Sequence, residues 1–151
     1  MIDSKMVSRA IVFATFHHNG QMRKFGSTEP FIFHPLRVML KMKTDVERVV
    51  AVLHDVLEDT DATPEDIEKE FPLGHPDHDV IYNALRAITR YPDEKYADYI
   101  DRVTQHPVAV RVKIEDIKDN INGGEGNIPD SLLARWGKSL RKLEDFKNVG
   151  I

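Results

Sequence analysis

The sequence predicts an all-α fold, with residues 1–151 forming a single compact multi-helix domain. Apolar residues recur at spacings of three and four along most of the chain, which is the pattern of amphipathic helices. Helix start signals occur at Thr44 with Glu47 and at Thr63 with Pro64. The sequence contains no series of strand-like segments and no internal repeat. A chain of 151 residues is long enough to bury a sizeable core as one domain.

Two helices are expected before the most informative stretch. Residues 4–17 carry an apolar stripe, and a short helix begins at His34-Pro35 and runs to Leu40. The segment 18–33 between them contains Asn-Gly, a further Gly and Pro, so it is expected to form a loop. This loop is long for a connector in a compact domain, which raises its functional interest.

Residues 49–60 form the stretch around which the chain is organised. Apolar side chains cover nearly the whole circumference of a helix here, as in a buried helix. They are interrupted by His54, Asp55, Glu58 and Asp59, which spacings of three and four place on one side. Burying three unpaired carboxylates costs on the order of several kcal/mol, so a cation is expected beside them. A metal ion is the simplest candidate, because adjacent His and Asp offer a ring nitrogen and a carboxylate oxygen.

Helix-capping and turn-forming residues predict where the remaining helices begin and end. Thr63-Pro64-Glu65-Asp66 combines a cap, a first-turn proline and acids near the positive helix end, and that helix is expected to end near Phe71-Pro72. A turn-rich stretch is expected at 74–79 and a flexible connector at 122–127. Further helical segments are expected at 80–88, 94–104, 108–121 and from 130 onward.

Composition and charge exclude several classes of function. Hydrophobic residues make up 41% and charged residues 30%, too apolar for a disordered chain. A net charge of −4 gives no general attraction to nucleic acid or an anionic membrane, and neither is expected as a partner. The absence of cysteine excludes disulfides and thiolate metal sites. No signal-peptide pattern and no apolar run of roughly 20 residues is found, so a cytoplasmic location is expected. The sequence leaves the oligomeric state open.

Two further metal candidates come from separate segments. His34 stands at a predicted helix start after an aromatic-apolar run, and Asp116 lies in a mostly apolar helix. A lone histidine is more often a core or cap residue, and a helical aspartate is usually a salt-bridge partner. Spacing alone therefore leaves open whether His34, His54, Asp55 and Asp116 form one ligand set.

Four segments in order resemble the HD-domain metal-dependent phosphohydrolases, and within them the hydrolase domain of RelA/SpoT-type alarmone enzymes. Residues 10–26 are similar to the opening helix and Arg-Lys loop of that family, and residues 30–36 to the segment with its first histidine. Residues 53–60, Leu-His-Asp-Val-Leu-Glu-Asp-Thr, match the central signature. Residues 112–120 resemble the segment that supplies the last aspartate.

The resemblance implies a metal centre. His34, His54, Asp55 and Asp116 would hold one divalent ion, usually manganese in that family, although the mixed donor set is also compatible with zinc, iron or magnesium. The ion would lower the pKa of a bound water and polarise a phosphoryl oxygen.

The resemblance also implies catalytic and substrate-binding residues. Glu58 and Asp59 would position and deprotonate the water; the alternative is a solvated helix end. Nucleotide contacts would come from Arg23, Lys24, Lys113 and Asn120. The alternative for Arg23 and Lys24 is a pair of solvated cations, and Lys113 has the alternative of pairing with Asp116 or Glu115.

The last motif departs from the family pattern. Many alarmone hydrolases read Ala-Asp-Arg-Leu-His-Asn, whereas this chain has Glu-Asp-Ile-Lys-Asp-Asn at residues 115–120. The segment 85–96 is shorter than expected and carries tyrosines and acids where the substrate pocket would close. The residues expected as metal ligands are unchanged by these departures. The departures therefore affect the expected identity of the substrate and not the expected metal site.

The favoured function is hydrolysis of a nucleotide by a metal-dependent phosphohydrolase, with guanosine 3′-diphosphate alarmones as the first substrate. One alternative is a nucleotidase for nucleoside monophosphates, which a substrate panel separates from the first. Another is a non-catalytic nucleotide-binding module, which would bind nucleotide without phosphate release. A purely structural alternative makes the polar residues internal salt bridges and predicts no bound metal.

Overall fold

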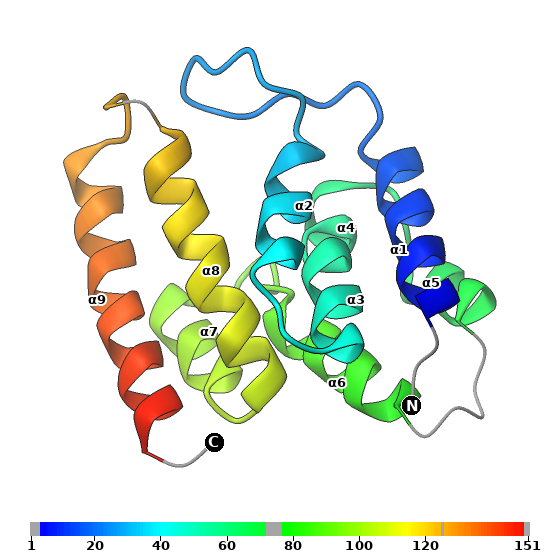
Figure 1. Ribbon diagram of the computed structural model, residues 1–151. Coiled ribbons are helices and arrows are strands. Elements are labelled where there is room, and N and C mark those ends of the chain that lie inside the picture. Colours follow the sequence, from blue (N-terminus) through cyan, green and yellow to red (C-terminus); the bar gives the residue numbers. More distant parts are fainter. Residues whose placement is uncertain (1–3, 72–76, 125, 150–151) are drawn as a thin grey trace.

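The computed structural model describes residues 4–71, 77–124 and 126–149, and helices are the regular elements within these ranges (Figure 1). They are α1 (Ser4–His17), α2 (Phe33–Leu40), α3 (Asp45–Leu53), α4 (Val56–Asp59), α5 (Pro64–Glu70), α6 (His78–Ile88), α7 (Tyr96–Val103), α8 (Pro107–Gly123) and α9 (Asp130–Asn148). The predicted all-α fold class is confirmed.

Helix α3 occupies the centre of the molecule. Helices α1, α2, α6 and α8 pack around it, and α9 lies against α8 (Figure 1). The five residues Val49–Leu53 have no exposed surface, as the uninterrupted apolar run predicts. Burying a side chain such as Leu53 contributes about 1.5–3 kcal/mol, so this helix is a main source of stability.

The first turn of α3 is fixed by the capping box that the sequence predicts. The Thr44 side chain accepts the backbone N–H of Glu47, and Glu47 Oε2 accepts the backbone N–H groups of Lys43 and Thr44 at 2.9 and 3.2 Å. The other carboxylate oxygen of Glu47 accepts from Arg111 Nε of α8 at 2.5 Å. The cap therefore also joins α3 to α8.

The expectation of one helix through residues 49–59 is wrong at His54 and Asp55. Helix α3 ends at Leu53, and α4 begins at Val56. His54 Nδ1 lies 2.6 Å from the carbonyl oxygen of Ala51, which in a continuous α-helix would accept from the backbone N–H of Asp55. The imidazole competes for the Ala51 carbonyl oxygen. The backbone N–H of His54 also donates to this oxygen, at 3.5 Å. His54 and Asp55 consequently lie in a turn between two helices.

The long loop expected at 18–33 is folded back on itself. The backbone N–H of Arg23 donates to Glu29 O at 2.9 Å, and that of Phe31 donates to Gln21 O at 2.8 Å. Phe25 has a φ of 63°, in the left-handed region that non-glycine residues rarely adopt. The loop spans the space from α1 to α2 and returns the chain to the predicted start of α2 (Figure 1).

Other boundaries differ by a few residues. Helix α8 continues through Gly123, so the first part of the connector expected at 122–127 is helical. Helix α6 begins at His78, within the stretch expected to be turn-rich, and residues 74–76 of that stretch lie outside the described residues. Pro72, near which α5 was expected to end, lies outside them too; α5 ends at Glu70.

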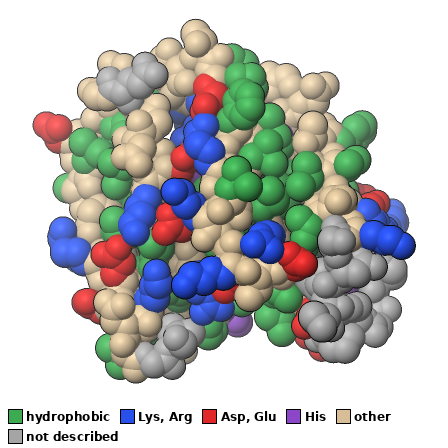
Figure 2. Space-filling model, viewed as in Figure 1, with side chains coloured by type: hydrophobic (Ala, Val, Ile, Leu, Met, Phe, Trp, Pro, Cys, Tyr) green, Lys and Arg blue, Asp and Glu red, His purple; other side chains and the backbone are tan. Residues whose placement is uncertain are grey.

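Surface charge is mixed on the face shown in Figure 2, where Lys and Arg side chains lie among Asp and Glu side chains. In the part of the chain that the structure describes, no helix combines the length and apolar character required to cross a bilayer.

Shortening Leu53 to alanine is expected to lower the free energy of unfolding by about 2–5 kcal/mol, because this side chain is completely buried. Urea denaturation followed by circular dichroism measures the change. The matched control is Leu40→Ala in α2, whose side chain is 76% exposed. That variant should stay within about 0.5 kcal/mol of wild type. Equal losses for the two variants would contradict the placement of α3 at the centre.

Candidate metal centre

Four polar residues from three parts of the chain meet beside the core. His34 comes from the first turn of α2, His54 and Asp55 from the turn between α3 and α4, and Asp116 from the middle of α8. One ligand atom of each lies within 4.8 Å of those of the others. The two imidazole Nε2 atoms are 3.2 Å apart, and each lies between 3.0 and 3.4 Å from Asp55 Oδ2 and Asp116 Oδ1. The structure thus brings together the four residues expected as ligands.

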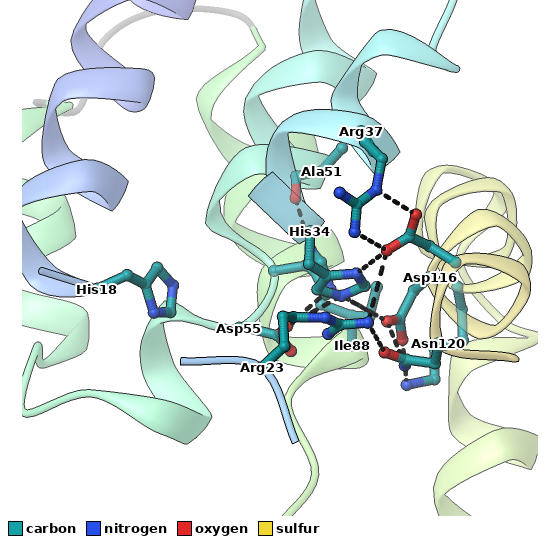
Figure 3. Close-up of polar contacts among 12 residues, drawn as sticks. His18, Arg23, His34, Arg37, Ala51, Asp55, Ile88, Asp116 and Asn120 are labelled. Atoms are coloured by element: carbon teal, nitrogen blue, oxygen red, sulfur yellow. Dashed lines mark hydrogen bonds and ion pairs between the residues drawn. The ribbon is translucent and has the colours of Figure 1, made fainter. Parts of the chain in front are cut away.

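Both histidines present Nε2 to this cluster because their other ring nitrogens are engaged. His34 Nδ1 lies 2.7 Å from Asp119 Oδ2, and His54 Nδ1 lies 2.6 Å from Ala51 O. Figure 3 shows His34 close to Asp55 and Asp116. A neutral imidazole that donates from Nδ1 keeps a lone pair on Nε2. Metal-binding histidines commonly have this arrangement.

The electrostatics of the cluster favour positive charge. Burial opposes protonation of His34, but hydrogen bonding to Asp116, Asp119 and Asp55 outweighs burial and raises its pKa to about 9. The pKa of His54 is likewise raised, since Asp55 and Asp116 outweigh complete burial. Burial would raise the pKa of Asp116, yet Lys113 and the two histidines hold it well below its usual range. A divalent cation satisfies the same demand for positive charge, and two imidazoles with two carboxylates are a donor set compatible with such an ion.

Lys113 and Asn120 both contact Asp116. Lys113 Nζ donates to Asp116 Oδ2 at 2.7 Å, and Asn120 Nδ2 donates to Asp116 Oδ1 at 2.9 Å. Asn120 Oδ1 in turn accepts from a terminal nitrogen of Arg23 at 3.1 Å. The pairing of Lys113 with Asp116, which the sequence left as an alternative, is therefore present. Arg23 also stands 5.8 Å from the centre of the Phe31 ring.

Glu58 and Asp59 lie on α4, directly after the ligand pair His54 and Asp55. Crowding by surrounding protein atoms raises the pKa of both carboxyl groups, although both remain open to solvent, and the Asp55 carboxylate adds to the effect. Glu58 Oε1 accepts the backbone N–H of Arg90, which fixes the end of this side chain. The two expected catalytic acids thus border the cluster.

A pocket of about 300 Å³ opens over the cluster. Its wall includes Asp55, Asp116, Glu58 and Asp59 together with all four expected substrate residues, Arg23, Lys24, Lys113 and Asn120. Further cations and aromatic rings that the sequence did not point to also line it: Phe25, Phe31, Arg90, Tyr99, Arg135 and Trp136. Tyr96 also lines the pocket, and it belongs to the segment 85–96, where the sequence predicts that the pocket closes. Nothing in the sequence indicated that Arg135 and Trp136, on the last helix, belong to the pocket.

Two residues behind the cluster were also missed as functional. Asp119 holds His34, and Arg37 donates to both oxygens of Asp119, from Nε to Oδ1 at 2.7 Å and from Nη2 to Oδ2 at 3.1 Å. In the sequence, Asp119 stood out as a departure from the family motif. The partner could not be read from the sequence, because Arg37 lies 82 residues away.

Comparison with known sequences relates the chain to part of much longer bacterial proteins. It is 34% identical over 127 residues to guanosine-3′,5′-bis(diphosphate) 3′-pyrophosphohydrolase of Aquifex aeolicus, covering 76% of this chain and 17% of that protein. It is 44% identical over 71 residues to the bifunctional (p)ppGpp synthase/hydrolase SpoT of Escherichia coli K12, covering 44% of this chain and 10% of that protein. The matched parts are therefore less than a fifth of these relatives. No protein-family model matches the chain.

The fold has a close counterpart among solved structures. A metazoan orthologue of SpoT, described as hydrolysing ppGpp and taking part in starvation responses, superposes with a TM-score of 0.74. The match covers 99% of this chain and 89% of that one at 24% sequence identity. At this level of identity the likeness establishes a shared fold.

In the metal-free protein, His34 is expected to make stability fall as the pH rises. Its pKa is about 9 in the folded protein against 6.5 ordinarily, so its stabilisation is complete below pH 6.5 and is lost as the pH rises through 9. Urea denaturation of EDTA-treated protein across this interval measures the effect. His34→Gln should reduce the decline, and a wild-type stability that rises instead would contradict these electrostatics.

Proposed function

Because the chain is an HD-type domain like the hydrolase part of RelA/SpoT proteins, we propose that it is a metal-dependent phosphohydrolase acting on (p)ppGpp-like nucleotides. The proposed reaction removes the 3′-pyrophosphate. The observation that carries the proposal is the cluster of His34, His54, Asp55 and Asp116 at the base of a pocket lined by cations. The named activities of the relatives point to the same chemistry.

The four clustered residues would hold one divalent ion, with Mn²⁺ as the proposed metal. Nε2 atoms of both histidines and one oxygen each of Asp55 and Asp116 are the donors that face one another. When bound, the ion supplies Lewis-acid polarisation of a phosphoryl oxygen and lowers the pKa of a bound water. The protein adds a rigid donor set, since three of the four side chains are almost completely buried.

Glu58 and Asp59 would orient the attacking water and take its proton. A raised pKa suits this role, because a general base works best when its pKa approaches the working pH. The backbone N–H of Arg90 holds Glu58 without neutralising it. The water oxygen would form a bond to the phosphorus next to the ribose, the bond from that phosphorus to the 3′ oxygen would break, and the 3′ oxygen would leave with a proton.

Arg23, Lys24, Lys113 and Asn120 would bind the nucleotide. Arg23 offers a planar fork for a phosphate or a surface for a base, and it is already placed by Phe31 and Asn120. Lys24 is an exposed cation on the pocket wall, free to follow a charged group. Lys113 and Asn120 steady Asp116 and also line the pocket. Such a wall suits a substrate with several negative charges.

The decisive experiment measures pyrophosphate released from guanosine tetraphosphate by Mn²⁺-loaded protein, beside release of phosphate from nucleoside mono-, di- and triphosphates. We expect pyrophosphate from the tetraphosphate alone. Asp55→Ala should abolish both metal retention and turnover, because it removes a ligand from the centre of the cluster. Turnover of monophosphates alone would favour the nucleotidase alternative, and full activity of Asp55→Ala would refute the mechanism.

Replacing Glu58 by glutamine is expected to lower kcat by about 10²–10⁴-fold, the usual contribution of a general base. Mn²⁺ affinity should remain near wild type, because Glu58 lies outside the ligand cluster. In wild type, kcat should fall on acidification at a pKa above the ordinary 4.5 of glutamate, since protonation removes the base. Glu65→Gln, on the exposed first turn of α5, is the control and should leave kcat unchanged.

A further inference from the structure

Asp119 connects a proposed metal ligand to a second layer of charged side chains. It stands three residues after Asp116 on α8, about one turn away, and its Oδ2 lies 2.7 Å from His34 Nδ1. The His34 ring is therefore held on both sides: Asp119 meets one nitrogen, and the ligand cluster faces the other. The Asp119 side chain is only 16% exposed, which protects this contact from water.

Asp119 is itself clamped by Arg37, which Glu29 holds in turn. Arg37 presents Nε and Nη2 to the two oxygens of Asp119 at 2.7 and 3.1 Å, a forked arrangement that fixes the plane of the carboxylate. The remaining side of the guanidinium bonds both oxygens of Glu29 at 2.5 and 2.8 Å. Glu29 belongs to the loop 18–33, so the loop, α2 and α8 all contribute to holding one carboxylate.

Helices α2 and α8 contact each other through residues that are three positions apart on each helix. His34 and Arg37 are three residues apart on α2, and Asp116 and Asp119 are three residues apart on α8. His34 lies between Asp116 at 3.0 Å and Asp119 at 2.7 Å. Arg37, one turn further along α2, donates to the same Asp119. This arrangement leaves little freedom for the His34 ring to rotate.

The two histidines of the cluster differ in how they are oriented. His54 is held by the backbone carbonyl of Ala51, which every residue at position 51 would supply. His34 is held by a side chain, at one of the positions where this sequence departs from the family motif. Its orientation therefore depends on the identity of residue 119.

We infer that Asp119 is a positioning residue for the metal centre: by accepting a hydrogen bond from His34 Nδ1, it keeps Nε2 aimed at the ion, and Arg37 and Glu29 keep Asp119 in place. This inference rests on the proposed function, because it requires the cluster to bind a divalent ion. Groups behind a ligating histidine typically change metal affinity by about 10–100-fold when removed.

Titration of metal-free protein with Mn²⁺, followed by isothermal calorimetry at neutral pH, tests the inference. Asp119→Ala should raise the Kd by about 10–100-fold. Asp119→Asn keeps a carbonyl oxygen that accepts from Nδ1, so its Kd should lie between those of wild type and Asp119→Ala. Arg37→Gln leaves the carboxylate in place and should raise the Kd less than Asp119→Ala does.

The control is Glu47→Gln, which disturbs a comparably buried Arg–carboxylate pair at the start of α3. It should lower the Tm while leaving the Mn²⁺ Kd unchanged. An Asp119 with a merely structural role would behave in the same way. A lower Tm with an unchanged Mn²⁺ Kd in both Asp119 variants would therefore overturn this inference and leave the proposed function standing. If wild type itself fails to bind Mn²⁺, the proposed function and the inference fail together.

Discussion

The structure depends on one electrostatic constraint: Asp55 and Asp116 share a small space with two imidazoles beside a core of aliphatic side chains. Carboxylates this close repel each other, and burial deprives them of water, so they require positive charge between or beside them. Lys113 provides part of it, and the raised pKa values of His34 and His54 show that the cluster draws in further positive charge. The demand for a cation thus follows from packing, independently of any relative.

The backbone meets this constraint by interrupting its most apolar helix. A continuous helix through residues 49–59 would keep every backbone hydrogen bond, but it would leave the His54 ring without its carbonyl partner. The structure gives Ala51 O to the imidazole instead and places His54 and Asp55 in a turn. The complete burial of Val49–Leu53 on one side of the break supplies the stability that such an interruption requires.

Much of the fold was predictable because its determinants are local. Helical periodicity, the capping box at Thr44, the cap and proline at Thr63-Pro64 and the turn residues identify the elements to within a few residues. The ligand cluster was predictable only with the family resemblance, because spacing cannot show that His34 and Asp116 meet. The break at His54 was missed, since apolar periodicity carries no information about a side chain that competes for a backbone carbonyl. Asp119 and Arg37 were missed because their pairing spans 82 residues.

The proposed metal-binding part and the proposed substrate-binding part of the site are built differently, and this difference bears on specificity. The clustered ligands stand on or beside packed helices, where α2, α3 and α8 leave little tolerance for change. The pocket wall above them comes from the loop 18–33, the segment around Arg90 and Tyr96, and α9. Arg135, exposed on α9, reaches to 4.1 Å from the centre of the Tyr96 ring, and Arg90 stands over the same ring at 5.5 Å. Arg90, Tyr96 and Arg135 lie in this wall and outside the cluster of His34, His54, Asp55 and Asp116, so changes there would leave the proposed metal chemistry in place while altering the substrate. The choice of substrate would then depend in part on Arg90, Tyr96 and Arg135, which lie outside the four segments of the family resemblance.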